Sequence, residues 1–146
     1  MEDNTQWIIS IRFRGKSGTM WQAIAGMMYG VVQRGWGLWM QHGAYLYWSG
    51  SSKTGVLSGL IVDLGKWHTL VIRRNLNTLV FHLRTEGTAT EKSLTMAWST
   101  TLSVHQQKTL GGQWPSQNEN FVGDVSYIKF AHTKPNSNFE RRCRFF

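Results

Sequence analysis

A polar loop near the end of the chain carries residue types that could bind a sugar. Residues 112–120 place Trp114 among the amide side chains of Gln113, Asn118 and Asn120. An aromatic ring can stack on the apolar face of a sugar while amides hydrogen-bond to its hydroxyl groups. Alternatively, the tryptophan covers the edge of a core and the amides are solvated. The sequence leaves both readings open, and these four residues are candidate ligand-binding residues.

A second candidate surface lies in residues 44–49. Tyr45, Tyr47 and Trp48 put aromatic rings on both faces of an expected strand. Tyr47 joins the candidate ligand-binding residues on this ground. The alternative, that these rings fill the core, carries more weight here because large aromatic side chains are mostly buried.

Paired carboxylates, which glycosidase chemistry requires, do not occur at suitable spacings. Retaining and inverting glycosidases hold two carboxyl groups about 5 Å or about 6.5–9.5 Å apart. Apart from Glu2 and Asp3, no two acidic residues lie within two positions of each other, so no expected strand presents two acids on one face. The single cysteine, Cys143, has no motif around it, and no nucleophile elbow is visible. We therefore predict that the protein is not an enzyme.

Potential metal ligands are scattered along the chain. Calcium needs several oxygen ligands, usually from more than one carboxylate, whereas Asp63, Glu119 and Asp124 form no evident cluster. Zinc needs grouped His or Cys side chains, and the five histidines are dispersed. We predict no metal and no cofactor.

The chain is basic, with a formal net charge of +8 and an isoelectric point near 10.1. Such a balance can attract nucleic acid, acidic polysaccharides, anionic lipids or acidic proteins, or it can simply keep the protein in solution. Arg12 and Arg14 share one expected strand face, and Arg73 and Arg74 lie at a turn. No nucleic-acid-binding motif accompanies them, so dispersed solubilising charge is favoured over a nucleic-acid partner.

Residues 134–146 are expected to form a basic tail. Arg141, Arg142, Phe145 and Phe146 combine charge with aromatic rings there, and we predict that they dock a neighbouring protein subunit. The N-terminus has no basic segment followed by an apolar run, so no signal peptide is expected. No stretch reaches about 18 consecutive apolar residues, so no membrane span is expected.

Alternating side chains predict the strands that would position these residues. In residues 6–14 and 78–84, apolar side chains alternate with polar ones, the period of a strand with one dry face. Residues 66–84 are read as two strands joined by a tight turn, because their first arm is rich in Thr, Val, Ile and Trp, which suit a strand. Asn75 and Asn77 mark this turn. Further strands are expected at 35–41, 44–49, 56–64, 88–98, 108–112 and 121–132.

Residues 20–32 are ambiguous, because their composition suits a helix whereas Gly26 and Gly30 argue against a long one. We expect an extended buried segment. In the last strand, alternation puts Val125 and Tyr127 on the face opposite Ile128. Strands about every ten residues indicate an all-β, antiparallel two-sheet sandwich with little or no helix. We expect one such domain over residues 1–133, followed by the tail.

Several segments, in the right order, resemble laminin G-like domains. Residues 63–68 read Asp-Leu-Gly-Lys-Trp-His and resemble the D-G-x-W-H segment of that family, with Leu64 as an extra residue. Residues 110–112 and 121–128 resemble its L-G-G … F-x-G-x-I ending, and residues 35–38 fit an early strand. The resemblance covers about residues 6–132 and implies the concanavalin A-like jelly roll.

Within that fold we expect Trp67 to anchor the core between the sheets. His68 should be a satisfied core or rim histidine, and Asp124 should bond local backbone amides. The resemblance further implies a lectin-like module.

We therefore expect a non-catalytic recognition module that binds a glycan or a surface partner. Lectin-like folds usually work outside cells, so display on a phage or viral particle, or at an extracellular surface, would explain a chain without a visible signal peptide. The alternative is a structural or assembly protein of the same fold, such as a virion decoration or tail protein, that has no sugar site. Its partner would be a neighbouring protein subunit.

Overall fold

The structure, a computed structural model, describes residues 6–18, 21–27, 36–50, 53–97, 108–110 and 120–132. The chain forms β-strands there, with one single-turn 3₁₀ helix, η1 (His42–Ala44). The strands are β1 (Gln6–Gly15), β2 (Gln22–Met27), β3 (Trp36–Gln41), β4 (Tyr45–Gly50), β5 (Lys53–Ile61), β6 (His68–Asn75), β7 (Thr78–Thr85), β8 (Glu91–Ala97), β9 (Lys108–Leu110) and β10 (Gly123–His132).

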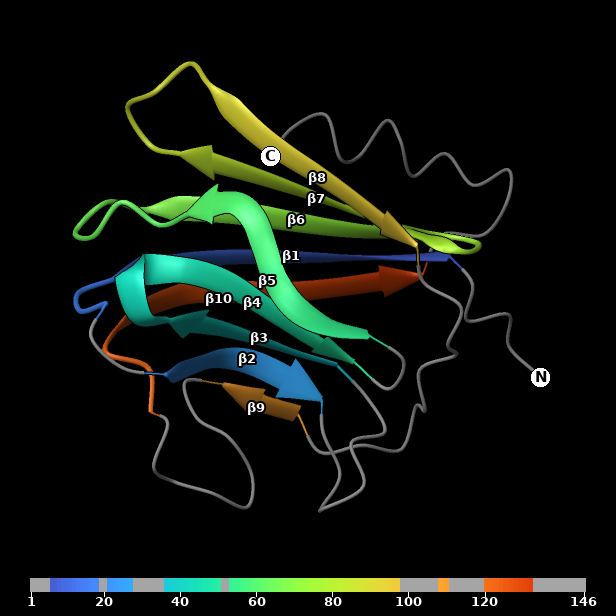
Figure 1. The fold of residues 1–146 in the computed structure, drawn as a ribbon, viewed down its shortest axis with the longest axis horizontal. Helices are drawn as coiled ribbons and strands as arrows, with labels where there is room; N and C mark the ends of the chain where they lie inside the picture. Colours follow the sequence, from blue (N-terminus) through green and yellow to red (C-terminus); the bar gives the residue numbers. More distant parts are fainter. Residues whose placement is uncertain are drawn as a thin grey trace.

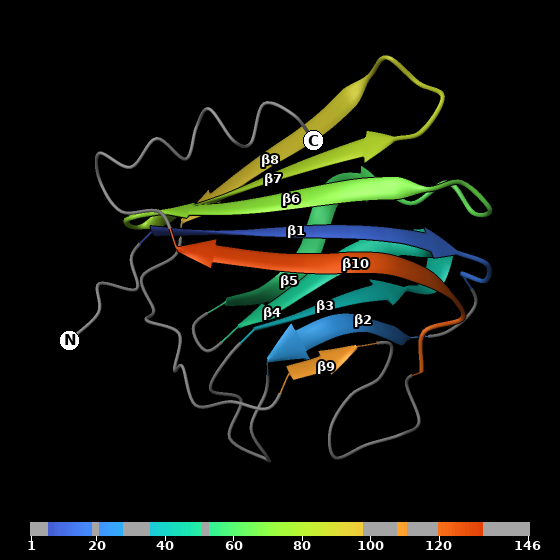
Figure 2. The same cartoon turned by 180° about the vertical axis from the view of Figure 1, so that it is seen from behind.

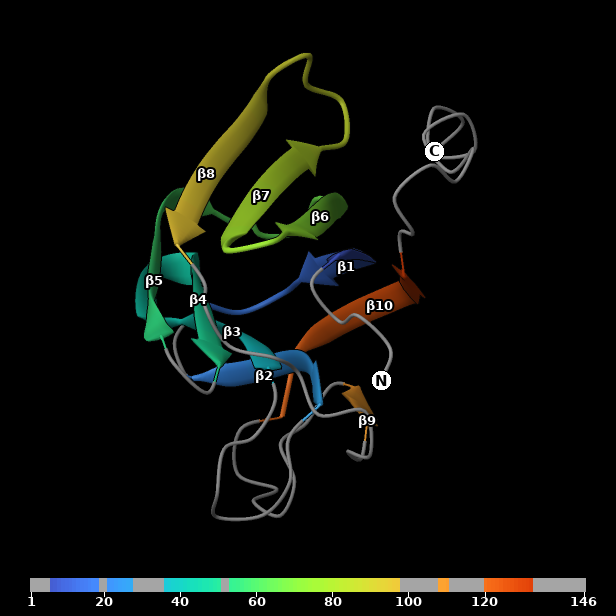
Figure 3. The same cartoon turned by 90° about the vertical axis from the view of Figure 1, so that its right-hand side faces the viewer.

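The strands form two antiparallel sheets that pack face to face (Figures 1 and 3). Sheet A has the order β10-β1-β6-β7-β8, and sheet B has the order β5-β4-β3-β2-β9. Seen from behind, sheet A lies in front of sheet B and turns its outer face to the viewer (Figure 2). The predicted two-sheet sandwich is confirmed, and the segment at 20–32 contributes the extended strand β2.

Aromatic rings occupy the centre of the core between the sheets. Trp36 and Trp48 of sheet B stack with ring centroids 5.5 Å apart and planes 6° from parallel. Phe81 of sheet A meets the Trp48 ring edge-on at 5.5 Å. Trp7 is fully buried, and so are Ile9 and its strand neighbours on the same face. The alternation in residues 6–14 therefore arises, as expected, because one face of β1 is buried.

The beginning of β10 departs from the predicted alternation. Val125 lies opposite Phe13, whereas Tyr127 lies opposite Arg12, so Ser126 is an extra residue on β10. This β-bulge turns Val125 towards the core, where it packs together with Ile128. The prediction that Val125 and Tyr127 share a face was wrong because strict alternation cannot anticipate an inserted residue.

A buried glutamine ties the beginning of β2 to one end of the β1–β10 pair, where β1 ends and β10 begins. The Gln22 side chain is 1% exposed. Its amide donates a hydrogen bond to the Ser17 carbonyl oxygen at 2.6 Å, and its own carbonyl oxygen accepts one from the Val122 backbone N–H at 2.8 Å. The two bonds satisfy the polar atoms that burial would otherwise leave without water.

The β6–β7 hairpin turns through Leu76 and Asn77, as the asparagines predicted. Leu76 has φ of 51°, in the left-handed region, and its side chain is 57% exposed. This region is unfavourable for leucine, whereas asparagine tolerates it.

We expect Leu76→Asn to raise the free energy of unfolding by about 0.5–1 kcal/mol, because it relieves backbone strain without removing core contacts. Urea denaturation measures this change. Leu64→Asn is the control, since Leu64 is also exposed but lies outside the left-handed region. An equal gain from both substitutions would show that polarity, and not backbone conformation, causes the effect.

Candidate functional site

The outer face of sheet A brings together side chains from all five of its strands. The strand register places one row of residues directly across the sheet: Tyr127, Arg12, Thr69, Arg84 and Glu91. The neighbouring row consists of Lys129, Ser10, Val71, His82 and Ser93. Successive side chains of a strand point to opposite faces of the sheet. Since the residues between the members of these rows on β1, β6 and β7 are buried in the core, both rows lie on the outer face.

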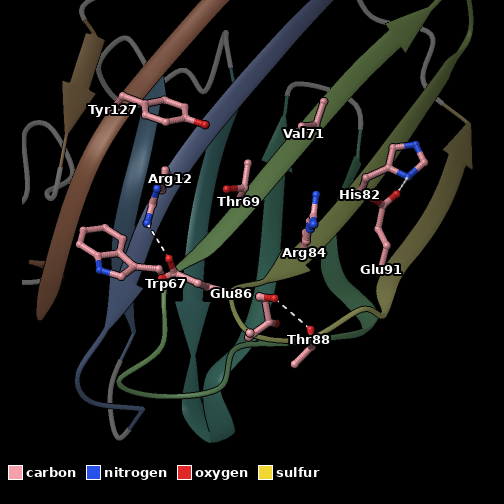
Figure 4. A pocket seen from close by; sticks show the side chains of 12 residues that line it. Arg12, Trp67, Thr69, Val71, His82, Arg84, Glu86, Thr88, Glu91 and Tyr127 are labelled. Atoms are coloured by element: carbon pink, nitrogen blue, oxygen red, sulfur yellow. Dashed lines mark hydrogen bonds and ion pairs between the residues drawn. The ribbon is translucent and has the colours of Figure 1, made fainter. Parts of the chain in front are cut away.

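A groove of about 470 Å³ runs across these rows and is open to solvent (Figure 4). We call it the outer groove. Its lining combines aromatic, hydroxyl, cationic and carboxylate side chains: Arg12, Trp67, Thr69, Val71, His82, Arg84, Thr85, Glu86, Gly87, Thr88, Glu91 and Tyr127.

Trp67 is held at one end of the outer groove by two arginines. The guanidinium carbons of Arg12 and Arg14 each lie 5.0 Å from the centre of the Trp67 ring, a cation–π arrangement. The prediction that Trp67 anchors the core between the sheets was wrong. His68 faces the core, so alternation sends its predecessor Trp67 to the outer face.

Asp124 fixes the position of Arg14. The Arg14 guanidinium donates two hydrogen bonds to Asp124 Oδ2, at 2.9 and 2.6 Å, and Lys16 Nζ lies 3.1 Å from Oδ1. These cationic hydrogen-bond donors, Arg14 first, lower the pKa of Asp124. Asp124 therefore pairs with cationic side chains, whereas the sequence suggested that it would bond local backbone amides.

The two carboxylates of the outer groove each face a basic side chain. Glu86 lies 3.4 Å from Arg12, and Glu91 Oε1 lies 2.8 Å from His82 Nδ1. The sequence analysis did not predict two acids on one site. Glu86 belongs to the turn after β7 and Glu91 begins β8, so the chain reversal, and not a shared strand, brings them to the same groove.

His68 confirms the prediction of a satisfied core histidine. It is 1% exposed, and its ring stacks on Phe13 with centroids 5.7 Å apart. Nε2 lies 3.0 Å from the Asp63 carbonyl oxygen, and Nδ1 lies 3.0 Å from the Thr85 hydroxyl. Since a carbonyl can only accept, Nε2 carries the proton and Nδ1 accepts from Thr85. Burial lowers the pKa of His68.

The described ranges hold no group of three or more His, Cys, Asp or Glu side chains that could bind a metal ion. Two of the three oxygen donors considered for calcium have cationic partners. Asp63 faces Lys66 at 3.7 Å, and Asp124 faces both Arg14 and Lys16. Cationic neighbours do not suit a calcium site. In the same ranges, no helix is long and apolar enough to cross a membrane.

Two of the candidate ligand-binding residues can be placed. Tyr47 lies on the outer face of sheet B, where Trp21 and Trp39 meet it edge-on at 4.8 and 6.4 Å. Asn120 is exposed and forms an isolated bridge to Ala23. The structure therefore does not bring Tyr47 into the outer groove. The other predicted site residues lie outside the described ranges: Gln113, Trp114, Asn118, Arg141, Arg142, Phe145 and Phe146.

The groove residues that sequence reasoning passed over did carry a signal. Thr69 and Val71 alternate with buried Leu70 and Ile72, and His82 and Arg84 alternate with buried Phe81 and Leu83. Residues 78–84 were recognised as a strand with two different faces, and residues 66–74 were recognised as a strand from their composition. What the sequence did not reveal is the strand order, which places β1 between β10 and β6 and so assembles the rows.

No protein-family model and no curated protein sequence matches the chain. Solved structures do match it, at low sequence identity. The LG1–3 region of the laminin alpha2 chain matches with a TM-score of 0.68 and 12% identity, over 88% of this chain and 27% of that chain. The enzymatically active domain of bacteriophage CBA120 tailspike protein 2 matches with a TM-score of 0.67 and 9% identity, over 92% and 23%.

A third match is of similar size to this chain. The CBM40 of the Ruminococcus gnavus IT-sialidase, bound to alpha2,3 sialyllactose, has a TM-score of 0.65 and 14% identity, over 93% of this chain and 80% of that chain. By contrast, the chain spans only about a quarter of the laminin and tailspike chains. At these identities the likeness concerns the fold alone, and the chain has the lectin-like jelly-roll fold that its sequence resemblance implied.

Proposed function

We propose that this chain is a non-catalytic carbohydrate-recognition module that binds a glycan in the outer groove of sheet A. The composition of the groove carries this proposal. Two aromatic rings, Trp67 and Tyr127, stand at one end, while hydroxyl and charged side chains line the rest (Figure 4). Sugars need this combination, because their C–H faces pack on rings and their hydroxyl groups require hydrogen-bond partners.

The aromatic end of the outer groove is preorganised. Arg12 and Arg14 hold the Trp67 ring, Asp124 holds Arg14, and Lys129 Nζ lies 4.8 Å from the centre of the Tyr127 ring. Side chains fixed before a ligand arrives lose less conformational entropy when it binds. A shallow groove can then hold a flexible oligosaccharide.

The module is non-catalytic in this proposal because neither groove carboxylate is free. Arg12 faces Glu86 and His82 faces Glu91. A glycosidase needs one carboxylic acid that stays protonated and a second that acts as nucleophile or base. In this groove a basic side chain already occupies the space beside each carboxylate.

We further propose that the module is displayed on a surface that contacts glycans. The matched solved structures include a phage tailspike domain and a sialidase-associated CBM40. Display on a virion or at an extracellular surface fits both, and in either setting a neighbouring protein subunit would carry the module.

We expect Trp67→Ala to weaken glycan binding by about tenfold or more, since one aromatic platform and the support of Arg12 are lost together. A glycan array identifies the ligand, and isothermal titration then measures its affinity. The melting temperature should change little, because Trp67 lies outside the core.

Two other tryptophan variants serve as controls. Trp21 is 37% exposed and packs against Tyr47 on sheet B, so Trp21→Ala should leave binding unchanged. Trp114→Ala tests the loop at 112–120 in the same way. If either variant abolishes binding while Trp67→Ala does not, the glycan site lies on that surface and the outer groove is the wrong assignment.

A further inference from the structure

The charged side chains of the outer groove differ in whether an oppositely charged or basic side chain lies beside them. Arg12 faces Glu86, and His82 faces Glu91. Arg84 stands between Thr69 and Glu91 in its row, and among the described residues it has no acidic partner within ion-pair distance. Its side chain is exposed in the groove.

The His82–Glu91 pair explains why Arg84 stays without an acidic partner there. The register puts Glu91 directly opposite Arg84 on the neighbouring strand. The Glu91 side chain instead points along the strands to His82 Nδ1, 2.8 Å away, as Figure 4 shows. In this arrangement the Glu91 carboxylate lies beside His82, and Arg84 has no acidic partner among the described residues.

Building on the proposed glycan site, we infer that the outer groove recognises an acidic glycan, and that Arg84 binds a carboxylate group of the sugar. A guanidinium group presents two parallel N–H donors that match the two oxygens of a carboxylate. Thr69, directly across from Arg84, adds a hydroxyl group beside the bound anion.

The geometry also indicates how long the ligand is. Arg84 and Arg12 are separated by one intervening strand, β6, which corresponds to about 10 Å across the sheet. Tyr127 lies one strand further, beyond Arg12. A ligand that reaches both the aromatic end of the groove and Arg84 is therefore an oligosaccharide and not a single sugar.

The face around the outer groove favours anions as well. The cations Arg14, Lys16, Arg73 and Lys129 surround it, and Asp124 is the carboxylate placed among them. Such a field raises the encounter rate with an acidic polysaccharide. It does not by itself select a carboxylate over other anions, so the selective contact is assigned to Arg84.

The test compares acidic oligosaccharides with neutral counterparts of the same backbone. An array of oligogalacturonate beside its methyl ester, and of sialyllactose beside lactose, is probed with the whole chain and with two variants. Arg84→Gln removes the proposed anchor. Arg73→Gln removes one positive charge from the same face at a position that does not line the groove.

We expect the chain to bind at least one acidic form about tenfold or more tightly than its neutral counterpart. Arg84→Gln should abolish this preference, because binding of the acidic form falls to the level of the neutral form, while Arg73→Gln should keep the preference. Equal losses from both variants would overturn the inference, because they indicate unspecific attraction. Tighter binding of a thymidine oligonucleotide than of any acidic glycan would overturn it in favour of nucleic acid.

The outcomes also separate this inference from the proposed function. If acidic and neutral forms bind equally and Trp67→Ala weakens both, the glycan site stands and the assignment of Arg84 fails. If the folded chain binds no spot, both fail.

Discussion

Replacing Gly123 by alanine should lower the free energy of unfolding by about 3 kcal/mol. A Cβ atom at this position would lie well inside van der Waals contact of the Arg14 carbonyl oxygen, and 2.7 Å from two ring carbons of Phe121. The carbonyl belongs to the paired strand β1 and cannot rotate away as a side chain could. Relief of the clash therefore requires the β1–β10 pair to separate locally. Chemical denaturation followed by tryptophan fluorescence measures the loss.

Gly15 provides the matched control because it is the direct cross-strand partner of Gly123. A Cβ atom on Gly15 would meet the end of the Met40 side chain at 3.2 Å. A flexible methionine can adjust to such a contact, so Gly15→Ala should cost less than about 1 kcal/mol. Similar losses from both substitutions would contradict the proposed backbone clash.

His68→Gln should lower the free energy of unfolding by about 2 kcal/mol at pH 7.5. Glutamine carries a donor and an acceptor on a flexible chain, without the fixed positions from which the imidazole reaches Asp63 and Thr85, and it loses the stacking on Phe13. The variant should also remove the pH dependence of stability that the imidazole causes. If His68 contributed only by packing, there would be no such pH dependence to remove.

The sign of that pH dependence follows from the lowered pKa of His68. Since the folded state binds this proton less readily than the unfolded state, which titrates near 6.5, stability is complete above pH 6.5 and falls as the pH drops below it. One proton changes the free energy by at most about 1.4 kcal/mol per pH unit.

Melting temperatures measured from pH 7.5 to 5.0 test this prediction. This pH range lies above the one in which Asp124 titrates, since the pKa of Asp124 is lowered from 3.8. The difference between the unaltered protein and His68→Gln should shrink steadily as the pH falls. A difference that stays constant with pH would mean that His68 does not titrate in the folded protein as we describe.

Much of the fold could be predicted because burial leaves a periodic trace in the sequence. Leu79, Phe81 and Leu83 face the core, and Val80 and His82 face outward, as their alternation indicated. The glycine and asparagine breaks marked the turns for the same reason, since few other residues accept those backbone angles.

The candidate site could be predicted only in part, because a site on a sheet depends on which strands are neighbours. Arg12 and Arg14 were recognised as sharing a face, but their contact with Trp67 requires β1 to lie beside β6. Nothing local in the sequence specifies that pairing. Trp67 itself was assigned to the core because tryptophan is usually buried, whereas two guanidinium groups shield its ring on the outer face.

The bulge at Ser126 has a consequence for how copies of this protein could associate. In the described sheets, β10 is the last strand of sheet A, and a regular last strand presents a row of backbone groups that another chain can extend. An inserted residue breaks that row and increases the local twist, and Lys129 adds a charge beside it. Self-templated growth into fibrils along this border is thereby discouraged.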